Sequence, residues 1–379
     1  MQHHYPESQR HEALKAFIIE KIREAGGGIP FSEYMQHSLY TPELGYYMAH
    51  PNIFGATEEK DFVTAPEVSS LFGQTLANVC HAILKEMPHA VILELGAGSG
   101  KLAMDLLEAL EKLGTLPEAY WIYDVSPALR DEQKERLNSQ AIPVKWLEKL
   151  PEQPFCGIVI ANEVLDAMPA QKFQVGDKEC FECFVTYRDG IFQEEYRPTQ
   201  DLDIQQLGHY IREGNSPEIL KARPYQSERL PELTSFFNTL SASLQQGAVL
   251  LIDYGFPRHE FYHPDRHMGT LMCHQRQRTH ADPYHQVGLQ DITTHVDFTD
   301  VAEKAFDAGF AVAGYTQQAA FLMNAGILLL AEHIKTKTEI QLLTSPSEMG
   351  ELFKVMALTK ALNISPFPGF EHFDKRHSL

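Results

Sequence analysis

Three glycines that follow a short apolar segment have the most informative spacing in the chain. Residues 91–95 are mostly apolar and favour a β-strand, and Gly96, Gly98 and Gly100 then lead into an amphipathic stretch, 102–113, that predicts a helix. Residues without a Cβ let backbone N–H groups and a helix N-terminus approach a ligand closely. The pattern predicts a strand, a ligand-binding turn and a helix, with a purely structural turn as the alternative.

The spacing of these glycines narrows the class of ligand. A dinucleotide-binding turn needs G-x-G-x-x-G, whereas the third glycine here comes one residue early and Lys101 takes its place. A P-loop would need glycine at position 95 and Ser or Thr at position 102, and both residues are Leu. What remains is E-x-G-x-G-x-G, from Glu94 to Gly100, which is the pattern of the first strand and loop in class I methyltransferases that bind S-adenosylmethionine (SAM).

Asp124 ends the next predicted strand, residues 120–124. An acidic residue in this place can accept hydrogen bonds from the two hydroxyls of a ribose. Dehydrogenases use the same device, so Asp124 predicts nucleoside binding more than it predicts methyl transfer. The structural alternative is a helix N-cap ahead of Pro127, although Ser126 is the better-placed cap.

A polar cluster follows the predicted strand 156–161, in the sequence Ala-Asn-Glu-Val-Leu-Asp-Ala-Met-Pro of residues 161–169. Parallel sheets bind ligands at the carboxyl ends of their strands, so Asn162, Glu163 and Asp166 are expected where methyl donor and acceptor meet. A carboxylate pair can bind a guanidinium through two hydrogen bonds, orient it and raise the nucleophilicity of one nitrogen. In the structural alternative Asn162 and Asp166 cap the turn and Glu163 is solvated.

A second polar group, Asp253, Tyr254 and Gly255, stands at the end of the predicted apolar strand 248–253. A structural role and a functional role are equally open for this group.

Histidines are frequent downstream, but none of their spacings matches a zinc signature, and we expect no metal site. His295 alternates with apolar neighbours and is a candidate to point into the cleft. Cys180 and Cys183 form a single C-x-x-C in an alternating strand, which favours a structural role.

The remaining elements predict an α/β fold. A helix over 11–25 ends at three glycines, and a helix over about 67–88 precedes the glycine turn. Strands then alternate with helices, which indicates a parallel sheet covered by helices. The seven predicted core strands, the last two antiparallel, are residues 91–95, 120–124, 142–146, 156–161, 248–253, 310–315 and 353–359.

The alternation is interrupted after the fourth strand. Residues 171–197 predict a β-hairpin around Asp189-Gly190, and residues 201–246 predict helices broken at Pro217, Pro224 and Pro231. The expected organisation is a cap over residues 1–75, a first core part over 76–170, an inserted hairpin and helices over 171–246, and a second core part with a His-rich loop over 247–379.

Composition limits the classes of function. The chain has 379 residues, of which 44% are hydrophobic and 22% charged, as in ordinary soluble globular proteins. The net charge of −19 argues against a non-specific nucleic-acid binder. No apolar run is long enough for a membrane span, and the N-terminus has neither a signal core nor an organelle presequence. Five cysteines suggest no disulfide framework, so a reducing cytoplasm is expected.

Taken together, these motifs resemble the MidA family of SAM-dependent methyltransferases, relatives of a mitochondrial complex I assembly factor that is a protein arginine methyltransferase. The similarity covers nearly the whole chain, and the segments 161–169 and 291–298 are more specific than the glycines. The segments that carry it are 30–40, 45–47, 61–67, 93–100, 161–169, 253–255 and 291–298. The sequence departs from the family at Asp124, where Glu is usual, and at residues 56–60, where Gly is more usual.

The resemblance implies a class I methyltransferase fold, which is Rossmann-like with a seven-stranded, mostly parallel sheet. It implies SAM as cofactor, bound by Glu94, Gly96, Gly98, Gly100, Asp124, Val125 and Asn162. It implies that the methyl acceptor is handled by Glu163, Asp166, Asn162, Asp253 and His295.

The resemblance further implies a protein substrate with a target arginine, in eukaryotes on a complex I subunit. Without a presequence the chain is expected to be a bacterial, cytoplasmic member, whereas its eukaryotic relatives lie in the mitochondrial matrix. Neither nucleic-acid binding nor membrane insertion is expected, and the oligomeric state stays open, a homo-oligomer included. The alternatives are a non-catalytic assembly factor on the same fold, a methyltransferase for a small molecule or another residue type, and a nicotinamide oxidoreductase, which the glycine spacing disfavours.

Overall fold

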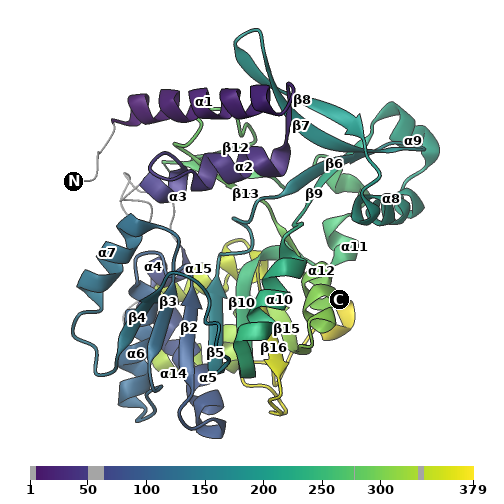
Figure 1. Ribbon diagram of the computed structural model, residues 1–379. Coiled ribbons are helices and arrows are strands. Elements are labelled where there is room, and N and C mark those ends of the chain that lie inside the picture. The colour runs from purple at the N-terminus through teal and green to yellow at the C-terminus, as the bar shows by residue number, and fades with distance from the viewer. Residues whose placement is uncertain (1–5, 50–63, 277, 332–336) are drawn as a thin grey trace. The chain divides into compact units, whose positions relative to one another are not determined.

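The computed structural model describes residues 6–49, 64–276, 278–331 and 337–379 and divides into two compact units (Figure 1). The sheet unit comprises Pro51–Leu165, Leu233–Gly255 and Phe298–Leu379. The hairpin unit comprises Met1–His50, Asp166–Glu232 and Phe256–Asp297. These boundaries differ from the expected organisation, because residues 64–75 belong to the sheet unit and the His-rich segment belongs to the hairpin unit.

The sheet unit contains all seven predicted core strands. They are β2 (Val91–Leu95), β3 (Tyr120–Tyr123), β4 (Val144–Leu147), β5 (Phe155–Asn162), β10 (Leu244–Phe256), β15 (Ala311–Gln317) and β16 (Phe353–Lys360). They follow the path β15-β16-β10-β5-β2-β3-β4, which Figure 1 shows with β4 at one edge. The pairs from β10 to β4 are parallel, whereas β16 is antiparallel to both β10 and β15. A single reversed strand therefore accounts for the antiparallel end of the sheet.

Helices cover this sheet, as the alternation of the sequence predicts. They are α4 (Ala65–Val68), α5 (Ser70–Glu86), α6 (Lys101–Lys112), α7 (Pro127–Arg136), α10 (Leu233–Ser243), α12 (Phe298–Asp307), α13 (Gln318–Asn324), α14 (Ile327–Ala331), α15 (Lys337–Thr344) and α16 (Met349–Leu352). Helix α5 packs against α6, and α10 packs against α12. Among the helices of the described segments, none is both long and apolar enough to cross a bilayer.

The central strands owe their position to apolar side chains on both faces. All five residues of β2 are buried, as expected for a strand that helices cover on both sides. Its neighbour β5 carries Gly157 directly opposite Val91, where an added Cβ would lie 2.1 Å from the Val91 carbonyl oxygen. Only glycine allows this close approach, which lies near the amino ends of the two strands, and their parallel pairing continues to Leu95 and Ala161 at the carboxyl ends.

The hairpin unit is built around a second, antiparallel sheet with its own apolar core. Its strands β1 (Ile29–Pro30), β6 (Gln171–Val175), β7 (Cys180–Arg188), β8 (Ile191–Pro198) and β9 (Tyr225–Arg229) follow the path β1-β7-β6-β9, with β8 paired to β7. The β7–β8 hairpin confirms the predicted turn, because Asp189 and Gly190 both have positive φ. The helical prediction for 225–229 is wrong, since these residues pair with β6, a partner distant in sequence.

The other elements of this unit are short, apart from its first two helices and α8. The helices are α1 (Glu7–Glu24), α2 (Phe31–Tyr40), α3 (Tyr46–Ala49), α8 (Leu202–Gly214), α9 (Pro217–Ala222) and α11 (Arg258–Phe261). The strands of the His-rich segment are β11 (Met272–Gln275), β12 (Arg278–His280), β13 (Asp291–Thr293) and β14 (Val296–Asp297). Strands β12, β11 and β13 form a three-stranded sheet in that order.

Candidate active site

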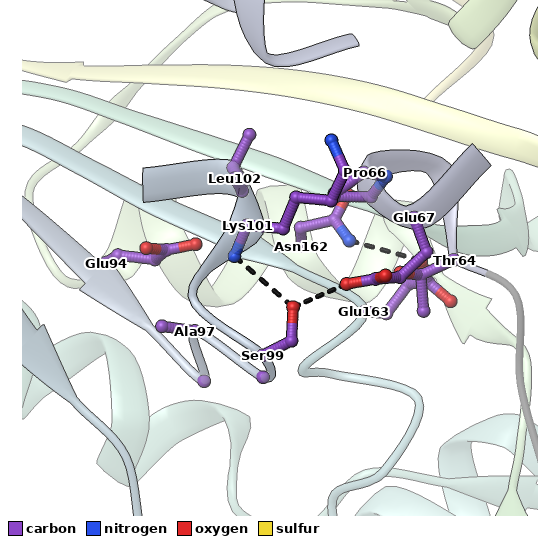
Figure 2. Close-up of a pocket in the computed structure, with 12 residues that line it drawn as sticks. Thr64, Pro66, Glu67, Glu94, Ala97, Ser99, Lys101, Leu102, Asn162 and Glu163 are labelled. Atoms are coloured by element: carbon purple, nitrogen blue, oxygen red, sulfur yellow. Dashed lines mark hydrogen bonds between the residues drawn. The ribbon is translucent and has the colours of Figure 1, made fainter. Parts of the chain in front are cut away.

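A pocket of about 410 Å³ lies beside the glycine turn of the sheet unit, and Figure 2 shows the residues around it. Its lining is Thr64, Pro66, Glu67, Glu94, Gly96, Ala97, Gly98, Ser99, Lys101, Leu102, Asn162 and Glu163. The carboxyl ends of β2 and β5 and the short helix α4 supply these residues. The pocket therefore forms where a parallel sheet is expected to bind its ligand.

The turn after β2 has a backbone that only glycine adopts easily. Gly96, Gly98 and Gly100 have φ values of 63°, 54° and 79°, all in the left-handed region. Gly100 is also the N-cap of α6 and gives that helix no side-chain cap. Because glycine has no side chain, the N-cap residue of α6 accepts no hydrogen bond from the first N–H groups of the helix. A turn that binds a ligand at a helix N-terminus requires such N–H groups.

Ser99 connects this turn to the segment that carries α4. Its hydroxyl donates to a Glu67 carboxylate oxygen and accepts from the Lys101 N–H at 3.3 Å (Figure 2). It also accepts from the Arg136 Nη1 at 3.0 Å. Residues 61–67 were expected to belong to a cap and carried only the family resemblance. Residues 61–63 lie outside the described part of the chain, whereas Thr64, Pro66 and Glu67 line the pocket.

Glu94 is a buried acid within β2 and lines the same pocket, while its role in binding the cofactor stays a prediction. The Tyr120 hydroxyl on β3 donates to its Oε2 at 2.8 Å. Burial raises the pKa of Glu94 to about 7, although the hydrogen bond from Tyr120 acts in the opposite direction. Burial thus disfavours the charged form of Glu94, and a cationic group placed in the pocket would favour it.

Asp124 lines a second hollow of about 540 Å³ together with Tyr123, Val125, Arg130 and Glu148. Val125 is 43% exposed there, so the predicted Asp124-Val125 pair does face accessible space. Arg130 and Glu148 were not identified from the sequence, since no motif marks them. The hollow lies in the sheet unit, after the ends of β3 and β4.

The carboxylate of Asp124 also supports its own turn. Its Oδ1 accepts from the Ser126 N–H at 2.9 Å and its Oδ2 accepts from the Gln133 Nε2 at 2.8 Å. Burial raises the pKa of Asp124, and these hydrogen bonds oppose that rise. Ser126 is the N-cap of α7, as predicted, so Asp124 does not cap that helix.

Glu163 combines an uncommon backbone conformation with a perturbed carboxyl group. It has φ of 53°, a left-handed backbone that is uncommon for a residue other than glycine and is found often at functional sites. Asn162 Nδ2 donates to its Oε1 at 3.1 Å, and the Tyr254 hydroxyl donates to its Oε2 at 3.2 Å. Burial, and then the negative charge of Asp253, raise the pKa of Glu163 to about 8.

Asp253 is buried and shapes the loop that carries Glu163. Its Oδ2 accepts from the Leu165 N–H at 2.9 Å and its Oδ1 accepts from the Tyr254 N–H at 2.8 Å. The Glu163 N–H donates in turn to the Ile252 carbonyl oxygen at 2.8 Å. Asp253 thus acts on Glu163 through the backbone and through its charge, while its predicted catalytic role stays a prediction.

Asp166 and His295, the other two predicted acceptor residues, belong to the hairpin unit. The Asp166 carbonyl oxygen accepts from the Thr294 N–H at 3.0 Å, and the His295 N–H donates to the Thr270 hydroxyl at 3.0 Å. The His295 ring lies 5.3 Å from the ring of Phe256. The two segments that the resemblance singled out thus meet within this unit, and the roles of Asp166 and His295 at the acceptor stay predictions.

The cysteines and histidines of the described segments form no metal centre. All five cysteines are free, and Cys180 and Cys183 are both buried in β7. Across the segments that the structure covers, no group of three or more His, Cys, Asp or Glu side chains could hold a metal ion.

The sequence matches known families over most of its length. A family model described as "Putative S-adenosyl-L-methionine-dependent methyltransferase" matches residues 73–316. The protein arginine methyltransferase NDUFAF7 of Xenopus laevis, named as mitochondrial, is 28% identical, with 91% of this chain and 84% of the relative covered. Its homologue in Drosophila melanogaster is also 28% identical, with 96% and 87% covered.

A solved structure from Burkholderia thailandensis is similar over almost the whole chain. That protein, described as a "likely methyl transferase", was crystallised with bound S-adenosyl-homocysteine (SAH). It is 41% identical, with a TM-score of 0.90 and with 98% of this chain and 97% of that chain covered.

Gly98→Ala should weaken SAH binding by about tenfold or more, because a Cβ in the left-handed region strains the loop that lines the pocket. Isothermal titration calorimetry with SAH measures the effect. Gly114→Ala is the matched control, since Gly114 also has positive φ, 68°, but has open space around it and does not line the pocket. Equal affinities of the two variants would contradict the assignment of the loop.

Proposed function

The chain belongs to this family of S-adenosyl-L-methionine-dependent methyltransferases, and from that premise we propose that it methylates an arginine side chain of a protein. The observation that carries the proposal is Glu163, a carboxyl group with raised pKa in the pocket that the glycine turn lines. The curated relatives support it, because they are named protein arginine methyltransferases.

The charges of the pocket fit the cofactor of the family. SAM carries an ammonium and a sulfonium group, and the pocket lining offers the carboxylates of Glu67, Glu94 and Glu163. Lys101, the one lysine among the lining residues that the structure describes, is paired with Asp105. We assign the amino-acid end of the cofactor to this pocket, next to the glycine turn.

The second hollow suits the nucleoside end. Asp124 is its buried carboxylate, and Glu148 is a further acceptor for hydrogen-bond donors of the ligand. The Asp124 carboxylate already accepts hydrogen bonds within the protein, among them those from Ser126 and Gln133, and a carboxylate has about four lone pairs to offer. A ribose hydroxyl can therefore join this network without displacing it.

Glu163 would bind and deprotonate the acceptor. When bound, SAM supplies the methyl group on its sulfonium sulfur. A guanidinium must lose one proton when one of its nitrogens takes a methyl group, and Glu163, with a pKa of about 8, can accept that proton whenever its carboxylate is ionised. Asn162 and Tyr254 each donate to one oxygen of this carboxylate, which keeps its orientation fixed.

The partner is accordingly a protein that exposes an arginine. The resemblance to the complex I assembly factor favours a subunit of a respiratory complex, and we place the reaction in a bacterial cytoplasm. The net charge of −19 suits a basic partner, because opposite charges speed the encounter of two proteins.

Labelling should identify the methylated residue. Purified protein and SAM with an isotopically labelled methyl group are added to an extract of cells that lack this gene, and mass spectrometry locates the label. We expect it on an arginine of one protein. Label on another residue type or on a small molecule would contradict the arginine assignment, and absence of label would favour a non-catalytic assembly factor.

Glu163→Gln should reduce methylation of the identified protein by about a hundredfold or more, because the amide cannot accept the proton that the guanidinium loses. SAH affinity should stay close to that of the wild type. Glu118→Gln, which removes an exposed carboxylate of the same unit, serves as the control. Full activity of the Glu163→Gln protein would refute the proposed role.

The pH profile should report the ionisation of Glu163. Because burial raises its pKa to about 8, the reactive carboxylate is scarce below that pH, so kcat/KM should rise with pH and level off above about 8. Tyr254→Phe removes a hydrogen bond that stabilises the carboxylate, so the rise should move to higher pH. A profile that is flat through this range in both proteins would contradict the assignment.

A further inference from the structure

Gln133 is a buried polar residue of α7 that lies between the two halves of the candidate site. Its side chain is fully buried, with 0% exposure. Its Nε2 donates to the Gly98 carbonyl oxygen and to the Asp124 Oδ2, both at 2.8 Å. One amide nitrogen thus connects the glycine turn, which lines the first pocket, to the carboxylate that lines the second hollow.

Trp146 on β4 fixes which way this amide points. The Trp146 Nε1 donates to the Gln133 Oε1 at 2.9 Å. An indole N–H can only donate, so the amide oxygen must face Trp146 and the amide nitrogen must face the turn. If the amide were turned over, its NH₂ group would face the Trp146 N–H, and both are donors. Its oxygen would then face the Gly98 carbonyl oxygen and the Asp124 Oδ2, and all three are acceptors. Every polar atom of the Gln133 amide therefore has a partner.

Gln133 is also packed tightly against the turn. A Cβ added to Gly100 would lie 3.3 Å from the Gln133 Cγ and 3.4 Å from its Cα. The turn therefore rests on the body of this side chain, while the Gln133 amide holds the Gly98 carbonyl. A buried network in which all groups are satisfied permits one arrangement, because any shift leaves a polar group without a partner.

We propose that Gln133 is a positioning residue for the cofactor, whose amide holds the Gly98 carbonyl and the Asp124 carboxylate in the arrangement that receives SAM. Trp146 contributes by orienting that amide. The inference rests on the cofactor of the family and not on the arginine assignment, so its test needs no methyl acceptor and can fail independently of the proposed function.

Gln133→Leu keeps much of the side-chain volume and removes all three hydrogen bonds. SAH affinity, measured by calorimetry, should fall about tenfold or more, because the Gly98 carbonyl and the Asp124 carboxylate lose a buried donor. Gln245→Leu, at an exposed glutamine of β10, is the matched control and should leave the affinity unchanged. Affinity of the Gln133→Leu protein within about twofold of the wild type would overturn the proposal.

Gln133→Glu gives a readout that a merely structural role would not produce. At low pH the introduced carboxyl group can still donate one hydrogen bond, whereas at high pH two carboxylates face each other and repel. The loss of SAH affinity should therefore grow from about pH 6 to about pH 9, more steeply than in the Gln133→Leu protein. Equal pH dependence in the two variants would contradict a direct contact of residue 133 with Asp124.

Trp146→Phe tests the orientation of the amide and remains informative if the Gln133 variants do not fold. It should weaken SAH binding by a smaller factor than Gln133→Leu, and the double variant should lose no more than Gln133→Leu alone, since both changes act through one amide. Additive losses, or unchanged affinity of the Trp146→Phe protein, would count against the proposed coupling.

Discussion

The burial of several carboxyl groups is the constraint on which the arrangement of the loops in the sheet unit depends. A buried acid is tolerated only where donors replace the lost hydration, and neighbouring strands of this unit end in such acids. Each has its donors in place: Glu94 from Tyr120, Asp124 from Ser126 and Gln133, Glu163 from Asn162 and Tyr254, Asp253 from Leu165 and Tyr254. These hydrogen bonds fix the loops that carry the residues proposed to bind the cofactor.

The same constraint gives the acids different tasks. Asp253 receives two backbone N–H groups and shapes a loop, whereas Glu163 receives two side-chain donors and feels the charge of Asp253. Burial, and then the charge of Asp253, raise the pKa of Glu163 to about 8 although both donors act in the opposite direction, and burial raises the pKa of Glu94 to about 7. Residues of one chemical type thus differ in protonation near neutral pH, because their surroundings differ.

Some elements of the fold were predictable from local sequence patterns, and others were not. The strand, glycine turn and helix from Val91 onward follow from local patterns, as does the hairpin at Asp189-Gly190, and the structure confirms both. Gln133 carried no signal, because a glutamine within a helix is ordinary until its three partners are known. Strand β9 was missed for the same reason, since its pairing partner β6 is distant in sequence.

The sequence by itself determined the class of fold, the family of SAM-dependent methyltransferases and the position of the glycine turn. These depend on backbone freedom and on periodic apolar residues, which are local properties of a chain. Only the tertiary structure decided that Thr64, Pro66 and Glu67 line the pocket, that Asp253 acts through a backbone loop, and that Gln133 joins Gly98 to Asp124. Hydrogen bonds and desolvation depend on which distant segments meet, and the order of residues along the chain does not specify that locally.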